Sequence, residues 1–149
     1  MPFSELCECQ LPADLRQLVE AAKNASYNAY APYSNFHVGA AVLLADGTIV
    51  TGSNQENAAY PSGLCAERVA LFSASSNHPN TPIIALALTA RGSDGLFTRQ
   101  PVSPCGSCRQ VLLECQQRAK NKIKVILTGR DKTILINDAA ELLPLAFSF

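Results

Sequence analysis

The sequence IIALALTA at residues 83–90 decides the fold class of this chain. It is a nearly continuous apolar run of strand length, which is typical of a strand covered on both faces. Helical patterns flank it, one expected over residues 64–76 and one over residues 103–119. Ser103 is a favoured N-cap residue and Pro104 suits the first position of that second helix. A buried strand between two helices predicts an α/β fold.

The same alternation continues toward the N-terminus. A long helix is expected from about residue 13 to residue 30, because apolar side chains recur every three or four positions until Pro32. Two apolar runs at residues 37–44 and 48–52 flank Asp46-Gly47, which predicts an antiparallel hairpin.

Two more strands are expected toward the C-terminus, at residues 123–128 and 133–136, followed by a short helix at residues 139–143. These elements predict five strands in one mixed sheet with helices on both sides. The fold class is therefore α/β, a three-layer α/β/α arrangement around a central five-stranded sheet.

Composition limits the function classes. The chain has 149 residues, the size of one ordinary domain, so we expect residues 1–149 to form a single domain. Twelve Lys and Arg balance twelve Asp and Glu, which argues against a nucleic-acid partner. No apolar run approaches the roughly 20 residues of a membrane-spanning helix. The N-terminal stretch MPFSELCECQLPADL has no basic leader, so a cytoplasmic location is expected.

Six cysteines need an explanation, and they stand at positions 7, 9, 65, 105, 108 and 115. Small secreted domains use disulfides in place of a core, but 48% of these residues are hydrophobic and no leader precedes them. The cysteines are therefore better explained as metal ligands or nucleophiles than as disulfides. Cys7, Cys9 and Cys115 are expected to have no role.

Two short motifs at predicted helix starts carry the chemistry. They are Cys65-Ala66-Glu67-Arg68 and Ser103-Pro104-Cys105-Gly106-Ser107-Cys108-Arg109-Gln110. Cys105 and Cys108 are three residues apart, so both thiols point to one side of a helix and can hold a soft divalent ion. A helix N-terminus also favours the thiolate that binds metal. Redox pairs use the same C-x-x-C spacing, although they do not call for a Cys-x-Glu forty residues upstream.

Zinc needs three or four ligands, and Cys65 is the obvious third. Three protein ligands leave one position open, which is typical of a catalytic zinc site. Glu67 should lie beside the metal, where it could take a proton from water and deliver it to a substrate. Arg68, Gln110 and the positive ends of both helices are expected to offset the negative charge of the thiolates.

The signature x-E followed by P-C-x-x-C is that of zinc deaminases. The chain closely resembles the small homotetrameric cytidine deaminases along nearly its whole length. The matching stretches include Tyr30 to Ala41, Asn54 to Tyr60, Cys65 to Arg68, Ser103 to Val111 and Glu141 to Pro144. The resemblance implies one Zn²⁺ per chain, a cytidine deaminase-like fold, and hydrolytic deamination of cytidine and 2′-deoxycytidine in pyrimidine salvage.

The resemblance also implies roles for individual residues. Phe36 resembles the aromatic residue that packs against the pyrimidine ring, and Asn54 and Glu56 resemble the pair that hydrogen-bonds the ribose 3′-hydroxyl. The backbone at Ala66 and the Glu67 carboxyl would contact the edge of the base. Two further aromatic residues match positions that extend into a neighbouring subunit's pocket: Tyr60 and Phe147.

Two other functions remain open at this point. One is a neighbouring specificity, such as a nucleoside antibiotic or a base carried by tRNA. No Arg or Lys falls within residues 30–60, which favours a free nucleoside over a phosphorylated substrate. The other is a closed four-thiolate zinc module that includes Cys115. That cysteine lies two helical turns beyond Cys108, about 10 Å away, which argues against it. His37 and His78 are expected to be structural.

Overall fold

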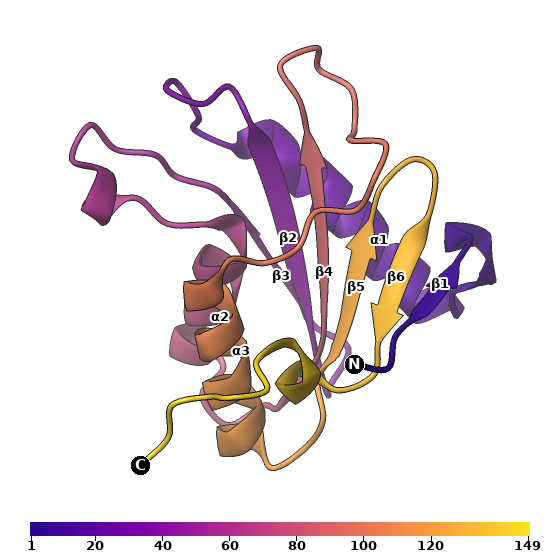
Figure 1. The fold of residues 1–149 in the computed structure, drawn as a ribbon. Coiled ribbons are helices and arrows are strands. Elements are labelled where there is room, and N and C mark those ends of the chain that lie inside the picture. The colour runs from indigo at the N-terminus through magenta and orange to yellow at the C-terminus, as the bar shows by residue number, and fades with distance from the viewer.

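The computed structural model describes residues 1–149 and contains one six-stranded mixed sheet with helices on both faces (Figure 1). The strands are β1 (Ser4–Leu6), β2 (His37–Leu44), β3 (Ile49–Ser53), β4 (Ile83–Arg91), β5 (Lys124–Thr128) and β6 (Thr133–Ile136). The α-helices are α1 (Ala13–Ala25), α2 (Ala66–Asn77) and α3 (Gly106–Ala119). Four 3₁₀ turns complete the chain: η1 (Glu8–Gln10), η2 (Ser26–Asn28), η3 (Tyr60–Ser62) and η4 (Ala139–Leu142).

Strand β4 lies in the middle of the sheet, as its apolar sequence predicts. The strand order is β1-β6-β5-β4-β2-β3, with β4 parallel to β5 and antiparallel to β2. Helix α1 packs on one face through Leu18, Val19 and Ala22, whereas Leu71 of α2 and Leu112 of α3 belong to the core on the opposite face. This arrangement confirms the three-layer α/β/α fold.

The prediction of five strands is wrong by one, because β1 adds a sixth strand beside β6. The strand has three residues, too few to show an alternating pattern. A partner far along the chain determines it: Ser4 pairs with Leu135, and the Glu5 carboxylate lies 2.7 Å from the ammonium of Lys132.

The predicted helices also differ from the observed ones. Helix α2, expected over residues 64–76, covers Ala66–Asn77. Helix α1 ends at Ala25 and a 3₁₀ turn follows, because the buried Ser26 hydroxyl donates to the Lys23 carbonyl at 2.6 Å and Arg91 donates to Ser26 from β4. Helix α3 begins after Cys105, which takes the N-cap position predicted for Ser103. The last predicted helix is the 3₁₀ turn η4. No helix is long and apolar enough to cross a membrane.

Two glycines allow the sheet to approach its covering helices closely. A Cβ on Gly39 of β2 would lie 1.9 Å from the Ala22 carbonyl oxygen of α1. A Cβ on Gly52 of β3 would lie 2.5 Å from the Ala70 nitrogen and 2.6 Å from the Ala66 oxygen of α2. Glycine at position 52 therefore determines how near the first turns of α2, which carry Glu67, lie to the sheet.

Candidate active site and metal centre

One large cavity opens beside the N-terminal ends of α2 and α3. Its volume is about 660 Å³, within the usual range for a small-molecule site. Most residues predicted from the sequence line it: Phe36, Asn54, Glu56, Tyr60, Cys65, Glu67, Arg68 and Cys105. The cavity therefore brings together residues that lie as far apart in the chain as Tyr33 and Cys105.

Three thiols converge at this cavity because the two helices begin side by side. Cys65 is the N-cap residue of α2, and Cys105 is the N-cap residue of α3, with Cys108 in the first turn of α3. The sulfurs of Cys65 and Cys105 are 3.8 Å apart, those of Cys105 and Cys108 are 3.5 Å apart, and all three lie within 4.8 Å of one another.

This geometry fits a tetrahedral zinc ion. Zinc–sulfur bonds of about 2.3 Å in a tetrahedron place the sulfurs roughly 3.8 Å apart, close to the observed separations. Cys115 is not part of the cluster. It lies in the buried face of α3 and lines a separate small cavity with His78, so the closed four-thiolate module is excluded.

The protonation of the thiols also favours a cation. Hydrogen bonding with Cys108 lowers the pKa of the Cys65 thiol, and the Arg68 guanidinium, whose Nη2 lies 3.6 Å from that sulfur, lowers it further. The pKa of Cys108 is raised by the same pairing with Cys65 and by burial. Close thiols thus retain protons between them, and a divalent cation can replace those protons as the neutralising charge.

Glu67 is a buried carboxyl beside the thiols. It is only 4% exposed, lies in the first turn of α2 and lines the cavity. Burial raises the pKa of Glu67 to about 7, and the negative charge of Cys65 acts in the same direction. A carboxyl with such a pKa can both accept and release a proton near neutral pH.

The two residues expected to offset the thiolate charge behave differently. Arg68 donates to Cys65, and its buried Nε has no hydrogen-bond partner. Gln110 instead donates its amide to the Phe147 carbonyl at 3.0 Å, which differs from its expected role beside the thiolates. Gln110 thereby holds the C-terminal segment against α3.

Asn54 and Glu56 organise the loop before β2. The Asn54 side chain accepts from the Val38 N–H and donates to the Phe36 carbonyl, both at 2.8 Å. The Glu56 carboxylate accepts from the Ser34 hydroxyl and from the N–H groups of Tyr33 and Ser34. The Ser34 hydroxyl is the main cause of the lowered Glu56 pKa.

Both side chains retain hydrogen-bonding capacity after these contacts. An amide nitrogen has two donors and a carboxylate about four acceptor positions. One Asn54 donor and three Glu56 acceptor positions are used within the chain. One donor and one acceptor therefore remain at the wall of the cavity.

The remaining predicted residues occupy distinct places. Phe36 is half-buried in the cavity wall, and Ala66 is fully buried at the start of α2. Tyr60 lines the cavity although it is 75% exposed, and it packs edge-on against Tyr33 with ring centroids 5.9 Å apart. Phe147 is 67% exposed and does not line this chain's cavity.

Several cavity residues were not predicted from the sequence. Apart from Tyr33, they are apolar or small and have no chemical signature of their own: Tyr33, Ser34, Val38, Leu64, Leu88, Val102 and Ser103. Arg109 was also missed. It donates to the Pro104 carbonyl at 2.8 Å and to the Leu142 carbonyl at 3.1 Å, which ties the turn before Cys105 to η4. Its position directly after Cys108 is the only signal in the sequence.

Cys7, Cys9 and His37 lie outside the three-thiol cluster. Cys7 and Cys9 form a disulfide, so the expectation that no cysteine pairs is wrong. His37 lies in β2 opposite Arg91, outside the three-thiol cluster, and its buried Nδ1 has no partner.

The fold and the three-thiol cavity define a zinc-dependent deaminase, and comparison with known proteins agrees. Residues 12–123 match the family described as the cytidine and deoxycytidylate deaminase zinc-binding region. The chain belongs to this family, and its cofactor is zinc.

Relatives of known name cover nearly the whole chain. It is 44% identical over 135 residues to a cytidine deaminase of Sporosarcina psychrophila, a match that covers 91% of this chain and 92% of that one. The crystal structure of a cytidine deaminase from Burkholderia pseudomallei has a TM-score of 0.73 at 43% identity and covers 88% of this chain and 97% of the other. A Mycobacterium tuberculosis cytidine deaminase has a TM-score of 0.71 at 35% identity, with coverage of 93% and 100%.

Proposed function

We propose that the protein catalyses the hydrolytic deamination of cytidine and 2′-deoxycytidine, which gives uridine or 2′-deoxyuridine and ammonia. One observation carries the proposal. A buried carboxyl, Glu67, and the three thiols of Cys65, Cys105 and Cys108 lie together at a cavity large enough for a nucleoside. Family membership and the similar cytidine deaminases support this substrate.

The residues around the thiols would act on the base. Cys65, Cys105 and Cys108 would hold one zinc ion per chain, which when bound supplies Lewis-acid activation of water for attack at C4. Glu67 would hold a proton, deliver it to ring N3 and then assist the departure of the amino group. The backbone at Ala66 would contact the edge of the base.

The protein matrix around Glu67 prepares it for this exchange. The whole residue is 4% exposed, and this burial keeps bulk water from competing for the proton. Arg68 donates to Cys65, and its positive charge partly neutralises the negative charge of that sulfur beside Glu67. Phe36, in the same cavity wall, would pack against the pyrimidine ring and hold the ring beside the Glu67 carboxyl.

The other end of the cavity would bind the sugar. Asn54 has one free donor and Glu56 one free acceptor position after their contacts within the chain. A hydroxyl group both donates and accepts, so this pair would satisfy the 3′-hydroxyl. Because that hydroxyl is common to ribose and deoxyribose, both nucleosides would bind.

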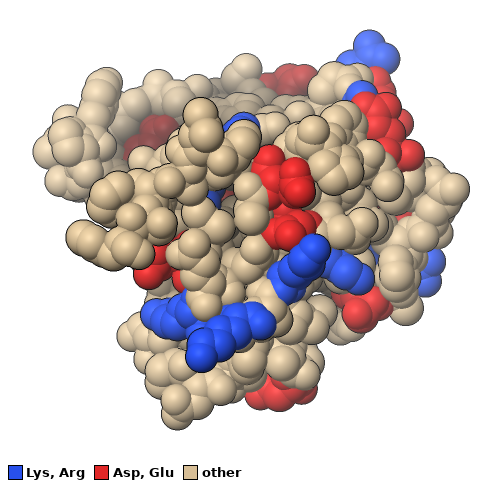
Figure 2. All heavy atoms as spheres, turned by 60° about the horizontal axis from the view of Figure 1, so that its bottom comes forward, with Lys and Arg blue, Asp and Glu red and all other residues tan.

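The charge distribution supports a small uncharged substrate. No Lys or Arg occurs in residues 30–60, which supply much of the cavity wall, and the one cavity arginine, Arg68, is engaged with Cys65. On the face drawn in Figure 2, the Lys and Arg side chains form a short band and smaller groups, and Asp and Glu side chains lie above and below the band. A free nucleoside suits these surfaces better than a polynucleotide.

We also propose that the enzyme is a homotetramer whose pockets are shared. Tyr60 and Phe147 are large aromatic residues, 75% and 67% exposed, which supports burial of both in contacts between subunits. Phe147 would then contact a neighbouring chain's pocket rather than its own. Light scattering at micromolar concentration tests this assembly, and a fully active monomer would contradict it.

Pyrimidine salvage in the cytoplasm is the setting that we propose for this reaction. A reducing compartment keeps cysteine thiols available to a metal, and the cavity offers three of them. The product of the reaction is again a free nucleoside, which suits the reuse of pyrimidines.

The experiment that tests the function is Glu67→Gln. Ammonia release from cytidine should fall by roughly 10²- to 10⁴-fold, because the amide cannot transfer a proton. Zinc content should stay at one ion per chain, since Glu67 is not a proposed ligand. Glu114→Gln, on the exposed side of α3, is the matched control and should keep full activity. Near-normal turnover by Glu67→Gln would contradict the proposed mechanism.

A further inference from the structure

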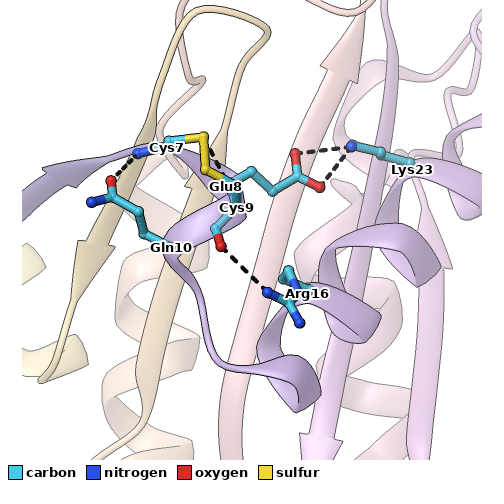
Figure 3. The surroundings of a disulfide bond; sticks show 6 residues. All are labelled: Cys7, Glu8, Cys9, Gln10, Arg16 and Lys23. Atoms are coloured by element: carbon cyan, nitrogen blue, oxygen red, sulfur yellow. Dashed lines mark hydrogen bonds and ion pairs between the residues drawn. A yellow bond between two sulfur atoms is a disulfide. The ribbon is translucent and has the colours of Figure 1, made fainter.

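The N-terminal segment carries a second sulfur site, away from the cavity. Cys7 and Cys9 are exposed and form a disulfide across a single intervening residue, on the turn η1 (Figure 3). The region matched by the family begins at residue 12, beyond both cysteines. We propose that Cys7 and Cys9 form an exchangeable dithiol–disulfide pair that reacts with small-molecule thiols and disulfides independently of the zinc-site thiols.

Access and geometry both favour exchange. Neither sulfur is covered by the core, so a small disulfide or thiol can approach from solvent. The Cys9 N–H donates to the Cys7 sulfur at 3.2 Å, which stabilises negative charge on that sulfur. During reduction, an external thiolate would therefore attack the Cys9 sulfur, and Cys7 would depart as the thiolate.

The turn keeps its shape without the disulfide, because other contacts hold it. Figure 3 shows these contacts around the pair. The Gln10 side chain accepts from the Cys7 N–H at 2.7 Å, and Arg16 donates to the Cys9 carbonyl at 3.3 Å. Glu8 forms an ion pair with Lys23 of α1 at 2.9 Å. The two sulfurs thus stay near each other in the reduced form, and closure of the bond requires no unfolding.

Oxidation by a small disulfide, RSSR, balances in two exchanges. One cysteine thiolate attacks RSSR, forms a mixed disulfide and releases RS⁻. The second cysteine thiolate attacks the protein sulfur of the mixed disulfide, closes the bond and releases the second RS⁻. The two protons lost by Cys7 and Cys9 complete two RSH molecules. The protein dithiol is oxidised and RSSR is reduced, with no other reactant.

The pair lies on the side of the sheet that does not carry the metal centre. The turn η1 leads through the buried Leu11 into α1, whose core is separate from the one that α2 and α3 share. In Figure 1, β1 and the turn that follows it lie at one edge of the sheet, and α2 and α3 lie toward the opposite edge. Exchange at Cys7 and Cys9 should therefore leave zinc and turnover unchanged.

The test uses the zinc-loaded protein in glutathione buffers of graded redox ratio. After the free thiols are alkylated, tryptic peptide 1–16 reports the pair, because it ends at Arg16 and holds only these two cysteines. The disulfide fraction should rise reversibly from one tenth to nine tenths over a roughly 80-fold change in [GSSG]/[GSH]², as a two-electron couple requires. Zinc content and ammonia release should stay constant throughout.

Single substitutions provide the controls. Cys7→Ser and Cys9→Ser each leave one thiol without a partner, so each should accumulate a glutathione adduct that wild-type protein resolves. A peptide that stays in the dithiol form in excess glutathione disulfide would overturn the proposal. So would a stable adduct in the wild-type chain. Loss of zinc in step with oxidation of the pair would show that the two sulfur sites are not independent.

Discussion

Gly52→Ala tests how the sheet positions the active site. The new Cβ would lie 2.5 Å from the Ala70 nitrogen, whereas ordinary contact begins at 3.4 Å, so β3 and α2 must separate by 0.9 Å (3.4 − 2.5). Both neighbouring atoms are backbone, so no side chain can move aside. Such overpacking costs about 1–3 kcal/mol, or roughly 2–12 °C in Tm for a domain of this size.

The shift also reaches the reacting groups. Glu67 and the N-cap residue Cys65 move with the first turns of α2, while Cys105 stays with α3. A displacement near 1 Å costs on the order of 10- to 100-fold in rate. Steady-state ammonia release from cytidine at saturating zinc, together with a thermal melt, measures both effects.

The matched control is Gly106→Ala, the same one-methyl change between two zinc-site cysteines. A Cβ there meets nothing within 4 Å. The kcat should therefore stay within about twofold of wild type, and the Tm should stay near the wild-type value. If Gly52→Ala keeps wild-type kcat and Tm, the inferred dependence of the site on this close approach is wrong.

Two further substitutions test contacts around the site and the fold. Arg109→Met should lower zinc affinity by roughly 10- to 100-fold in a chelator competition, because the Pro104 carbonyl before Cys105 loses its donor. Wild-type affinity would contradict this role. Asp138→Asn should lower the free energy of unfolding by about 1 kcal/mol at neutral pH, since the hydrogen bond from Gln116 and the Lys122 ammonium favour the carboxylate. The Asp138 pKa is lowered in the folded state, so its contribution is present above the unfolded pKa and disappears as the pH falls through the folded one. Urea unfolding of both proteins from about pH 5 to about pH 2 should show the difference shrinking, and a constant difference would contradict it.

Sequence reasoning succeeded where the signal is local and periodic. The apolar run at β4 identified the central strand. The i, i+3 spacing of Cys105 and Cys108 predicted two neighbouring thiols, and their sulfurs lie 3.5 Å apart although Cys105 is the N-cap residue before α3. Cys65 was predicted to join them because zinc needs at least three ligands. In the structure its sulfur lies near theirs because α2 and α3 begin side by side.

Three of the failures share another cause, which is a partner remote in sequence. Strand β1 forms because β6 offers an edge 127 residues later, where Lys132 meets Glu5. Helix α1 stops at Ala25 because Arg91 donates to Ser26 from β4. Gln110 meets the Phe147 carbonyl through the path of the C-terminal segment, which no pattern in residues 103–111 reveals.

The most direct test of the central claim is a zinc titration of metal-free protein, followed by ammonia release from cytidine. The three-thiol centre predicts activity that rises linearly with added zinc and reaches a plateau at one ion per chain. It also predicts that Cys105→Ser lowers both zinc retention and the plateau. Ammonia release that does not depend on zinc, or fully zinc-loaded protein that releases no ammonia from cytidine, would contradict the account.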